Sequence, residues 1–164
     1  MEGSTARILV VEDYEPFRRF FCSTLAKRAD LQIVGEALDG LEAVQKAEEL
    51  QPDLIVLDLG LPMLNGIEAA RQIRKLSPKS KIIFVTLESS ADLVQEAFSL
   101  GALGYVIKTR AGTDLLAAVQ AGEFAEVEIR YVLNHGSAWS CSRVAPCLSS
   151  RGGLSVTLIT TCVN

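Results

Sequence analysis

The sequence lacks a long apolar run: no stretch approaches the roughly 20 consecutive apolar residues that a membrane-spanning helix needs. Residues 1–6 also lack the basic flank and apolar segment of a secretory signal, and we expect them to form a flexible N-terminus. Hydrophobic residues make up 49% of the chain and charged residues 22%, which is typical of a soluble folded domain. We therefore expect a cytoplasmic protein without membrane contact.

Acidic residues and lysine are missing from the C-terminal part of the chain. All 20 acidic residues lie at or before Glu128, and with 13 of the 16 basic residues they give residues 1–128 a net charge of −7. The remaining residues, 129–164, hold three arginines, three of the four cysteines, and the only histidine and tryptophan. We predict one folded domain over 7–128 and an atypical tail over 129–164. The acidic balance argues against nucleic acid binding.

The tail shows no helix-turn-helix pattern, so we expect no DNA binding from this chain. His135 and the three cysteines of the tail could in principle bind zinc, but they contain no CxxC pair. We therefore interpret the cysteines as thiols without a metal. Our hypothesis is that the tail is the product of a shifted reading frame or a truncation rather than an evolved domain.

Between Arg7 and about Gly122, short apolar runs alternate with amphipathic stretches, which indicates a parallel sheet covered by helices on both faces. The doubly wound strand order 2-1-3-4-5 is the natural topology for this α/β pattern. Thr113 is the expected N-cap of the last helix. Four helical phenylalanines are interpreted as core: Phe17, Phe20, Phe21 and Phe98. The expected strands are 8–11, 32–36, 54–57, 82–85 and 105–107, and the expected helices are 14–29, 40–50, 66–76, 91–100 and the segment after Thr113.

Polar residues directly follow four of the expected strands. In a doubly wound sheet the carboxyl ends of the strands line one crevice, which would bring these side chains together. None of them is diagnostic alone: the acids could be ordinary helix-entry or turn residues, and the lysine a solvated surface group. The residues are Glu12, Asp13, Asp58, Thr86 and Lys108.

Three crowded carboxylates repel one another unless a cation lies among them, and ligation by oxygen alone favours Mg²⁺. We predict that Asp13 and Asp58 bind this ion directly, with the backbone carbonyl of Gly60 as a third ligand and Glu12 bound through water. No glycine-rich turn follows the first strand, which argues against a dinucleotide or P-loop site.

The same crevice suits phosphoryl transfer to a carboxylate. Asp58 ends a central strand and is the predicted nucleophile, giving an aspartyl-phosphate. Lys108 and Mg²⁺ would neutralise the phosphoryl oxygens, and Thr86 would donate a hydrogen bond to them. The enzyme-class alternative is an aspartyl-phosphate hydrolase of the haloacid dehalogenase type, which needs a second aspartate two residues after the nucleophile, where Gly60 stands.

Four separated motifs resemble the receiver domain of bacterial two-component response regulators, over about residues 6–122. Two further segments, 66–74 and 114–119, are most similar to receivers of LuxR/NarL-type transcription regulators. The four motifs are Val10–Asp13, Asp58–Gly66, Phe84–Thr86 and Gly101–Lys108.

The resemblance implies a phosphorelay signalling module rather than an enzyme, phosphorylated on Asp58 by a sensor histidine kinase. It implies that Thr86 moves toward the phosphoryl group and that Tyr105 rotates inward. This would change the face formed by the fourth helix, fifth strand and fifth helix, through which a homodimer is possible.

Two positions depart from the family pattern, and the output of the module stays open. Leu87 stands where many receivers have alanine or glycine, which would narrow access to the site, and Thr109 replaces the usual proline. The chain is either the input part of a transcription regulator without its helix-turn-helix or a stand-alone receiver that acts through protein contacts or phosphoryl relay.

Overall fold

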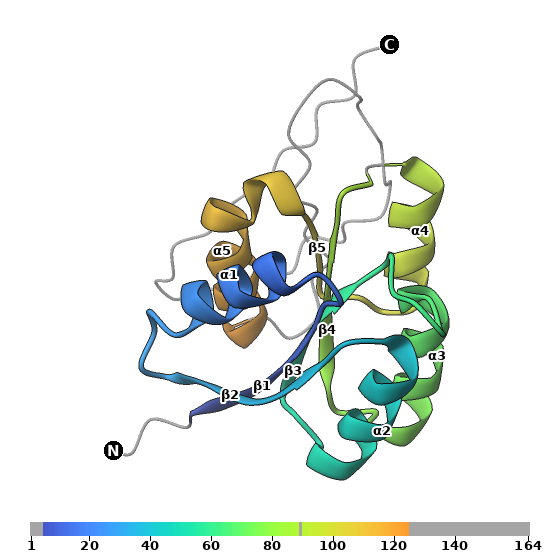
Figure 1. Cartoon of the computed structure of the whole chain (residues 1–164), viewed down its shortest axis with the longest axis horizontal. Coiled ribbons are helices and arrows are strands. Elements are labelled where there is room, and N and C mark those ends of the chain that lie inside the picture. The colour runs from blue at the N-terminus through green and yellow to red at the C-terminus, as the bar shows by residue number, and fades with distance from the viewer. Residues whose placement is uncertain (1–4, 89, 125–164) are drawn as a thin grey trace, which may run out of the picture. The chain divides into compact units, whose positions relative to one another are not determined.

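The computed structural model of the chain describes residues 5–88 and 90–124. The predicted tail over 129–164, with its cysteines and His135, lies outside these residues. Strands and helices alternate as the sequence predicts (Figure 1). The strands are β1 (Ala6–Val11), β2 (Leu31–Ala37), β3 (Leu54–Asp58), β4 (Lys81–Thr86) and β5 (Gly104–Ile107); the helices are α1 (Glu15–Leu25), α2 (Gly40–Leu50), α3 (Gly66–Leu76), α4 (Ala91–Ser99) and α5 (Ala111–Phe124), with a 3₁₀ helix at Lys108–Arg110.

The five strands form one parallel sheet in the order β2-β1-β3-β4-β5, which confirms the predicted topology. Asp58 is paired with Val85 across β3 and β4, so Thr86 follows one residue later along the same edge. The pairing of β1 with β2 is irregular, because Ile8 is paired with Ile33 but the next residue, Leu9, is paired with Gly35.

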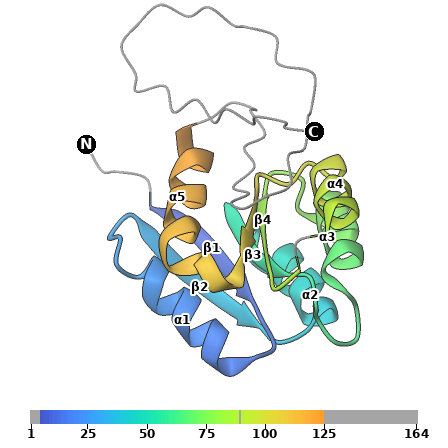
Figure 2. The same ribbon diagram turned by 90° about the horizontal axis from the view of Figure 1, so that it is seen from above.

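The sheet separates two hydrophobic cores. Helices α1 and α5 cover one face and α2, α3 and α4 cover the other, as the two perpendicular views in Figures 1 and 2 show. Side chains alternate between the faces along each central strand, so Ile8 and Val10 of β1 enter the α1/α5 core while Leu9 and Val11 enter the other. Because both faces are covered, the central strands are apolar at nearly every position.

Polar side chains cap the N-termini of α2 and α3. The Asp39 carboxylate accepts a hydrogen bond from the Glu42 backbone N–H at 2.8 Å at the start of α2, and Asn65 accepts one from the Glu68 N–H at 3.0 Å at the start of α3. Such caps satisfy donors that have no partner within the helix. They fix where the chain turns from the sheet into the helices.

Three details of the sequence prediction are wrong. The first helix ends at Leu25 rather than near residue 29, where a turn leads into β2. Thr113 does not cap α5, because the 3₁₀ helix already brings the chain into helical geometry and α5 begins at Ala111; the Thr113 hydroxyl instead donates to the Arg110 carbonyl. Phe20 is 39% exposed, since its ring lies beside Gly112 of α5 outside both hydrophobic cores, whereas Phe21 and Phe98 are buried.

Candidate functional site

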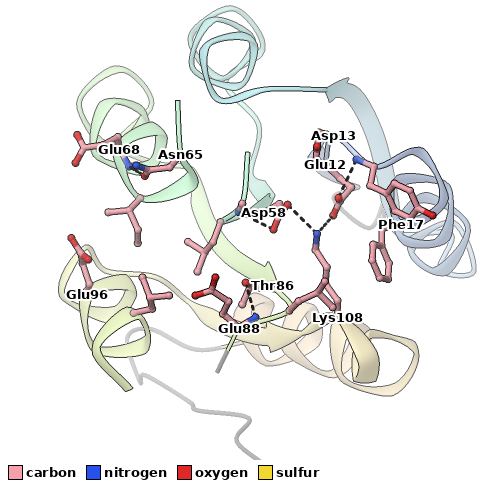
Figure 3. A pocket seen from close by; sticks show the side chains of 16 residues that line it. Glu12, Asp13, Phe17, Asp58, Asn65, Glu68, Thr86, Glu88, Glu96 and Lys108 are labelled. Atoms are coloured by element: carbon pink, nitrogen blue, oxygen red, sulfur yellow. Dashed lines mark hydrogen bonds and ion pairs between the residues drawn. The ribbon is translucent and has the colours of Figure 1, made fainter. Parts of the chain in front are cut away.

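Lys108 lies at the centre of the carboxyl edge of the sheet, between two buried carboxylates (Figure 3). Its ammonium nitrogen is 2.7 Å from Oε2 of Glu12 and 2.9 Å from Oδ2 of Asp58. The 3₁₀ helix that follows β5 places the lysine there, while the carboxylates come from the ends of β1 and β3. All three side chains are almost fully buried, so little water screens these charges.

Glu12 is the most enclosed of the acids, with no exposed surface. Its backbone N–H donates to the Ala37 carbonyl at 3.0 Å, and its Oε1 accepts from the Tyr14 N–H at 3.3 Å. No described group forms a hydrogen bond of normal geometry with Oε2, so Lys108 holds this oxygen as an ion pair. Burial raises the pKa of Glu12, and the Asp58 charge adds to this, while Lys108 opposes it.

Asp58 is the last residue of β3 and is only 3% exposed. Its Oδ1 accepts a hydrogen bond from the Gly60 backbone N–H at 3.2 Å, while Oδ2 faces Lys108. Gly66 packs directly behind it, because a Cβ added to that glycine would lie 2.1 Å from the Asp58 carbonyl oxygen. The start of α3 therefore fixes the backbone on which this carboxylate stands.

Asp13 completes a group of three carboxylates and is the only exposed one of the three. One oxygen from each of Glu12, Asp13 and Asp58 lies within 4.8 Å of the others. Among the described residues that line the pocket, Lys108 is the only one with a positive charge to balance these three carboxylates. An oxygen-only donor set with excess negative charge suits a hard divalent cation.

Thr86 and Tyr105 lie on adjacent strands and share the loop after β4. The Thr86 hydroxyl accepts from the Glu88 N–H at 3.1 Å, and the Tyr105 hydroxyl donates to the Glu88 carbonyl at 2.9 Å. Tyr105 is buried against the α2–α4 core rather than exposed. Burial raises its pKa to about 12, with a further increase from the Glu88 charge. The two predicted switch residues thus bond the N–H and the carbonyl of the same residue, Glu88.

A pocket of about 680 Å³ contains the site, and part of its lining was not predicted from the sequence. The Phe17 ring centroid is 4.9 Å from the Lys108 nitrogen, a cation–π contact, although Phe17 was interpreted as core alone. Its place in the first turn of α1, shortly after Glu12 and Asp13, was the available signal. Glu88 and Glu96 also line the pocket, and the sequence gives no local signal for them.

The two departures from the family pattern have different surroundings. Leu87 is 62% exposed and lines the pocket, and the narrowing of access that it would cause stays a prediction. Thr109 is an exposed residue of the 3₁₀ helix, and no peptide bond within the described ranges is cis. No described helix is long and apolar enough to cross a membrane.

Comparison with known proteins identifies the family. The response regulator receiver domain model matches residues 8–120. The response regulator protein VraR of Staphylococcus aureus is 37% identical over 116 residues, which cover 71% of this chain and 56% of that protein. The chain therefore spans about half the length of the curated relatives it matches.

Solved structures agree with this assignment. A LuxR-family two-component response regulator from Aurantimonas sp. SI85-9A1 is 36% identical with a TM-score of 0.68, covering 72% of this chain and 84% of that one. The response regulator domain of Thermotoga maritima CheB is 34% identical with a TM-score of 0.67, covering 74% and 98%. This chain belongs to the response regulator receiver domain family and is related to regulators of the LuxR/NarL type.

Proposed function

We propose that the chain accepts a phosphoryl group on Asp58, with Mg²⁺ bound by the neighbouring acids, and so transmits a signal from a sensor histidine kinase. Receiver domains are signalling modules that generally bind Mg²⁺ and are phosphorylated by sensor kinases. The observation that carries the proposal is the position of the buried Asp58 carboxylate, 2.9 Å from the Lys108 ammonium and within 4.8 Å of the acidic pair that follows β1, Glu12 and Asp13.

Asp13, Asp58 and the backbone carbonyl of Gly60 would hold the ion directly, and Glu12 would bind it through water. The mutual proximity of the three carboxylates, with one ammonium to balance them, supports this set. When bound, Mg²⁺ supplies positive charge that offsets both the carboxylates and the phosphoryl oxygens.

The residues of the chain would divide the transfer among them. A carboxylate oxygen of Asp58 forms the new O–P bond, and the bond from phosphorus to the donor breaks with its electron pair going to the leaving group. Lys108 stabilises the negative charge on the phosphoryl oxygens. The Thr86 hydroxyl, from the end of the adjacent strand, donates a hydrogen bond to one of them.

The loop after β4 would carry the change outward. A Thr86 hydroxyl drawn toward a phosphoryl group gives up its present bond from the Glu88 N–H, and Tyr105 holds the Glu88 carbonyl of the same peptide segment. The predicted consequence is a rearrangement of the face formed by α4, β5 and α5, the proposed homodimer surface. This couples a local charge to a packing change.

The output stays a proposal because the chain covers only part of its relatives. We favour the input part of a transcription regulator, and the alternative is a stand-alone receiver acting through protein contacts or phosphoryl relay. A cytoplasmic location and the lack of DNA binding by this chain also remain predictions. A gel-shift assay with LuxR-type promoter DNA tests the DNA-binding prediction: we expect no shift with this chain for either output, and a shift would contradict the prediction.

The test of the site is intact-mass analysis after incubation with acetyl phosphate and Mg²⁺. We expect the wild-type chain to gain one phosphoryl group and Asp58→Asn to gain none. Asp92→Asn, which neutralises an exposed acid on α4, is the matched control and should be labelled like wild type. Labelling that persists in Asp58→Asn would refute the assignment, and continuous turnover of small phosphate esters would favour the hydrolase alternative.

A further inference from the structure

We propose that Arg18 is a positioning residue that fixes the acidic pair after β1 in the arrangement needed to bind the divalent cation; this inference rests on the proposed function. Arg18 is not one of the residues that line the pocket, and it acts through the backbone of two that do, Glu12 and Asp13.

The guanidinium of Arg18 joins three segments of the chain. Its Nη1 donates to the carbonyl oxygens of Glu12 at 3.1 Å and Asp13 at 3.3 Å. Its Nε donates at 3.0 Å to Oε2 of Glu36 on β2, an ion pair in which the Arg18 side chain is 16% exposed. The planar group therefore points one nitrogen at the loop while the carboxylate of β2 fixes its orientation.

The loop that Arg18 holds has few other restraints. Tyr14, at the N-cap position of α1, provides no side-chain cap. The loop backbone is tied to the sheet through the Glu12 N–H and the Ala37 carbonyl, and the Glu12 carboxylate ties it to the Tyr14 N–H. The Asp13 side chain is exposed, so the direction of its carboxylate depends on the backbone that carries it. Arg18 holds the carbonyl of that same residue.

The geometry also explains why an arginine is needed. A lysine at this position keeps the charge, but a single ammonium has no planar fork with which to bond two loop carbonyls and the Glu36 carboxylate in fixed directions. The loop would then move relative to Asp58 and Lys108, and the three carboxylate oxygens would lose their common centre. Loss of such supporting contacts typically weakens metal binding by about 10–100-fold.

Electrostatics and positioning predict opposite outcomes for Arg18→Ala. Removing a positive charge near an acidic site should strengthen the binding of a cation, whereas releasing the loop should weaken it. Arg19 provides the matched control, because it is the next residue of α1 and its side chain is 80% exposed, paired with Glu15 at 2.6 Å on the helix surface. Arg19→Ala makes the same charge change without touching the loop.

The experiment is calorimetric titration of the full chain with MgCl₂ for wild type, Arg18→Ala, Arg18→Lys and Arg19→Ala, with urea unfolding of each. We expect the Mg²⁺ dissociation constant to rise about tenfold or more in both Arg18 variants and to stay within about twofold of wild type in Arg19→Ala. Labelling by acetyl phosphate should recover toward the wild-type rate when Mg²⁺ is raised to saturation, because Asp58 and Lys108 are unchanged.

Glu36→Gln is the second variant, since it keeps an oxygen acceptor for Arg18 but removes the negative charge of Glu36. We expect the Mg²⁺ dissociation constant to rise less in this variant than in the Arg18 variants. Tight Mg²⁺ binding by the folded Arg18 variants, equal to that of Arg19→Ala, would overturn the inference and leave the proposed function intact. An equal loss of labelling at all Mg²⁺ concentrations would also overturn it. A wild-type chain that binds no Mg²⁺ would overturn the proposed function itself.

Discussion

The single ammonium of Lys108 balances the charge of two buried carboxylates. Two buried carboxylates face it, and the Phe17 ring lies against it. A carboxylate left in such a place without a positive partner carries a desolvation cost of several kcal/mol. Single substitutions among these residues therefore change the stability of the fold as well as its chemistry, and a control for folding belongs with every functional measurement.

Cys22, on α1, permits a pH prediction at the residue scale. Burial raises its pKa to about 11, with a further increase from the Glu36 charge, while Arg18 opposes these effects. The thiolate is the reactive form, so at pH 8 Cys22 should react with iodoacetamide about 100-fold more slowly than a thiol of pKa 9.0. The rate should rise about tenfold per pH unit until the pH approaches 11.

Peptide-level mass spectrometry of the folded chain, with glutathione as the reference thiol, measures this rate. Cys22 alkylated as fast as glutathione at pH 8 would contradict the prediction. In the unfolded chain the difference should disappear, because the burial that raises the pKa is lost.

At the scale of elements, the contact between the end of β3 and the start of α3 is the tightest point of the site. Gly66→Ala would place a methyl group 2.1 Å from the Asp58 carbonyl oxygen, where backbone must move to make room. We expect a loss of about 1–3 kcal/mol in the free energy of unfolding, measured by urea denaturation.

Gly112→Ala is the comparison for this substitution. Gly112 lies in α5, where an added Cβ meets only the Phe20 ring at 3.5 Å, an ordinary contact. Alanine also favours the helix by up to about 1 kcal/mol over glycine. This variant should be as stable as wild type or more stable. Equal destabilisation of both variants would show that the close approach at Gly66 is not the cause.

Much of the element pattern could be predicted from the sequence, because fully apolar runs such as Leu54–Leu57 and polar residues at their ends are local signals. The convergence of Glu12, Asp58, Thr86 and Lys108 followed from the topology. Contacts between helices could not be predicted in this way. Arg74 of α3 donates to the Leu100 carbonyl at 2.9 Å and to Gly101, and only the packed structure brings these segments together.

The same limit explains the missed residues. Phe17 was assigned correctly to a helix, but its approach to Lys108 depends on how α1 lies against the 3₁₀ helix after β5. Arg18 lies on α1, whereas the two loop carbonyls and the β2 carboxylate that it contacts belong to two other segments of the chain. The periodicity of a sequence indicates which face of a helix is polar, but it does not indicate which residues that face contacts.

For the whole molecule, the sequence predicts that residues 7–128 form the folded unit, and the core residues that the structure describes all precede residue 120. We expect a fragment of residues 1–128 to unfold cooperatively in urea, with a free energy of unfolding within about 1 kcal/mol of the full chain. It should also be labelled by acetyl phosphate. A fragment without a cooperative transition would show that residues after 128 are required for folding.

The irregular pairing of β1 with β2 decides which helix the Glu36 side chain can reach. Leu31 and Ile33 point to the α1/α5 core, but after the unpaired Val34 the alternation is reversed: Gly35 approaches Leu50 of α2, Ala37 enters the α2–α4 core, and Glu36 is left on the side of α1. The same residues paired without this irregularity would turn Glu36 away from Arg18, whereas a strand that lacks Val34 would alternate regularly and still direct its glutamate toward α1. When relatives are aligned, a gap at position 34 is therefore compatible with the contact between Arg18 and Glu36.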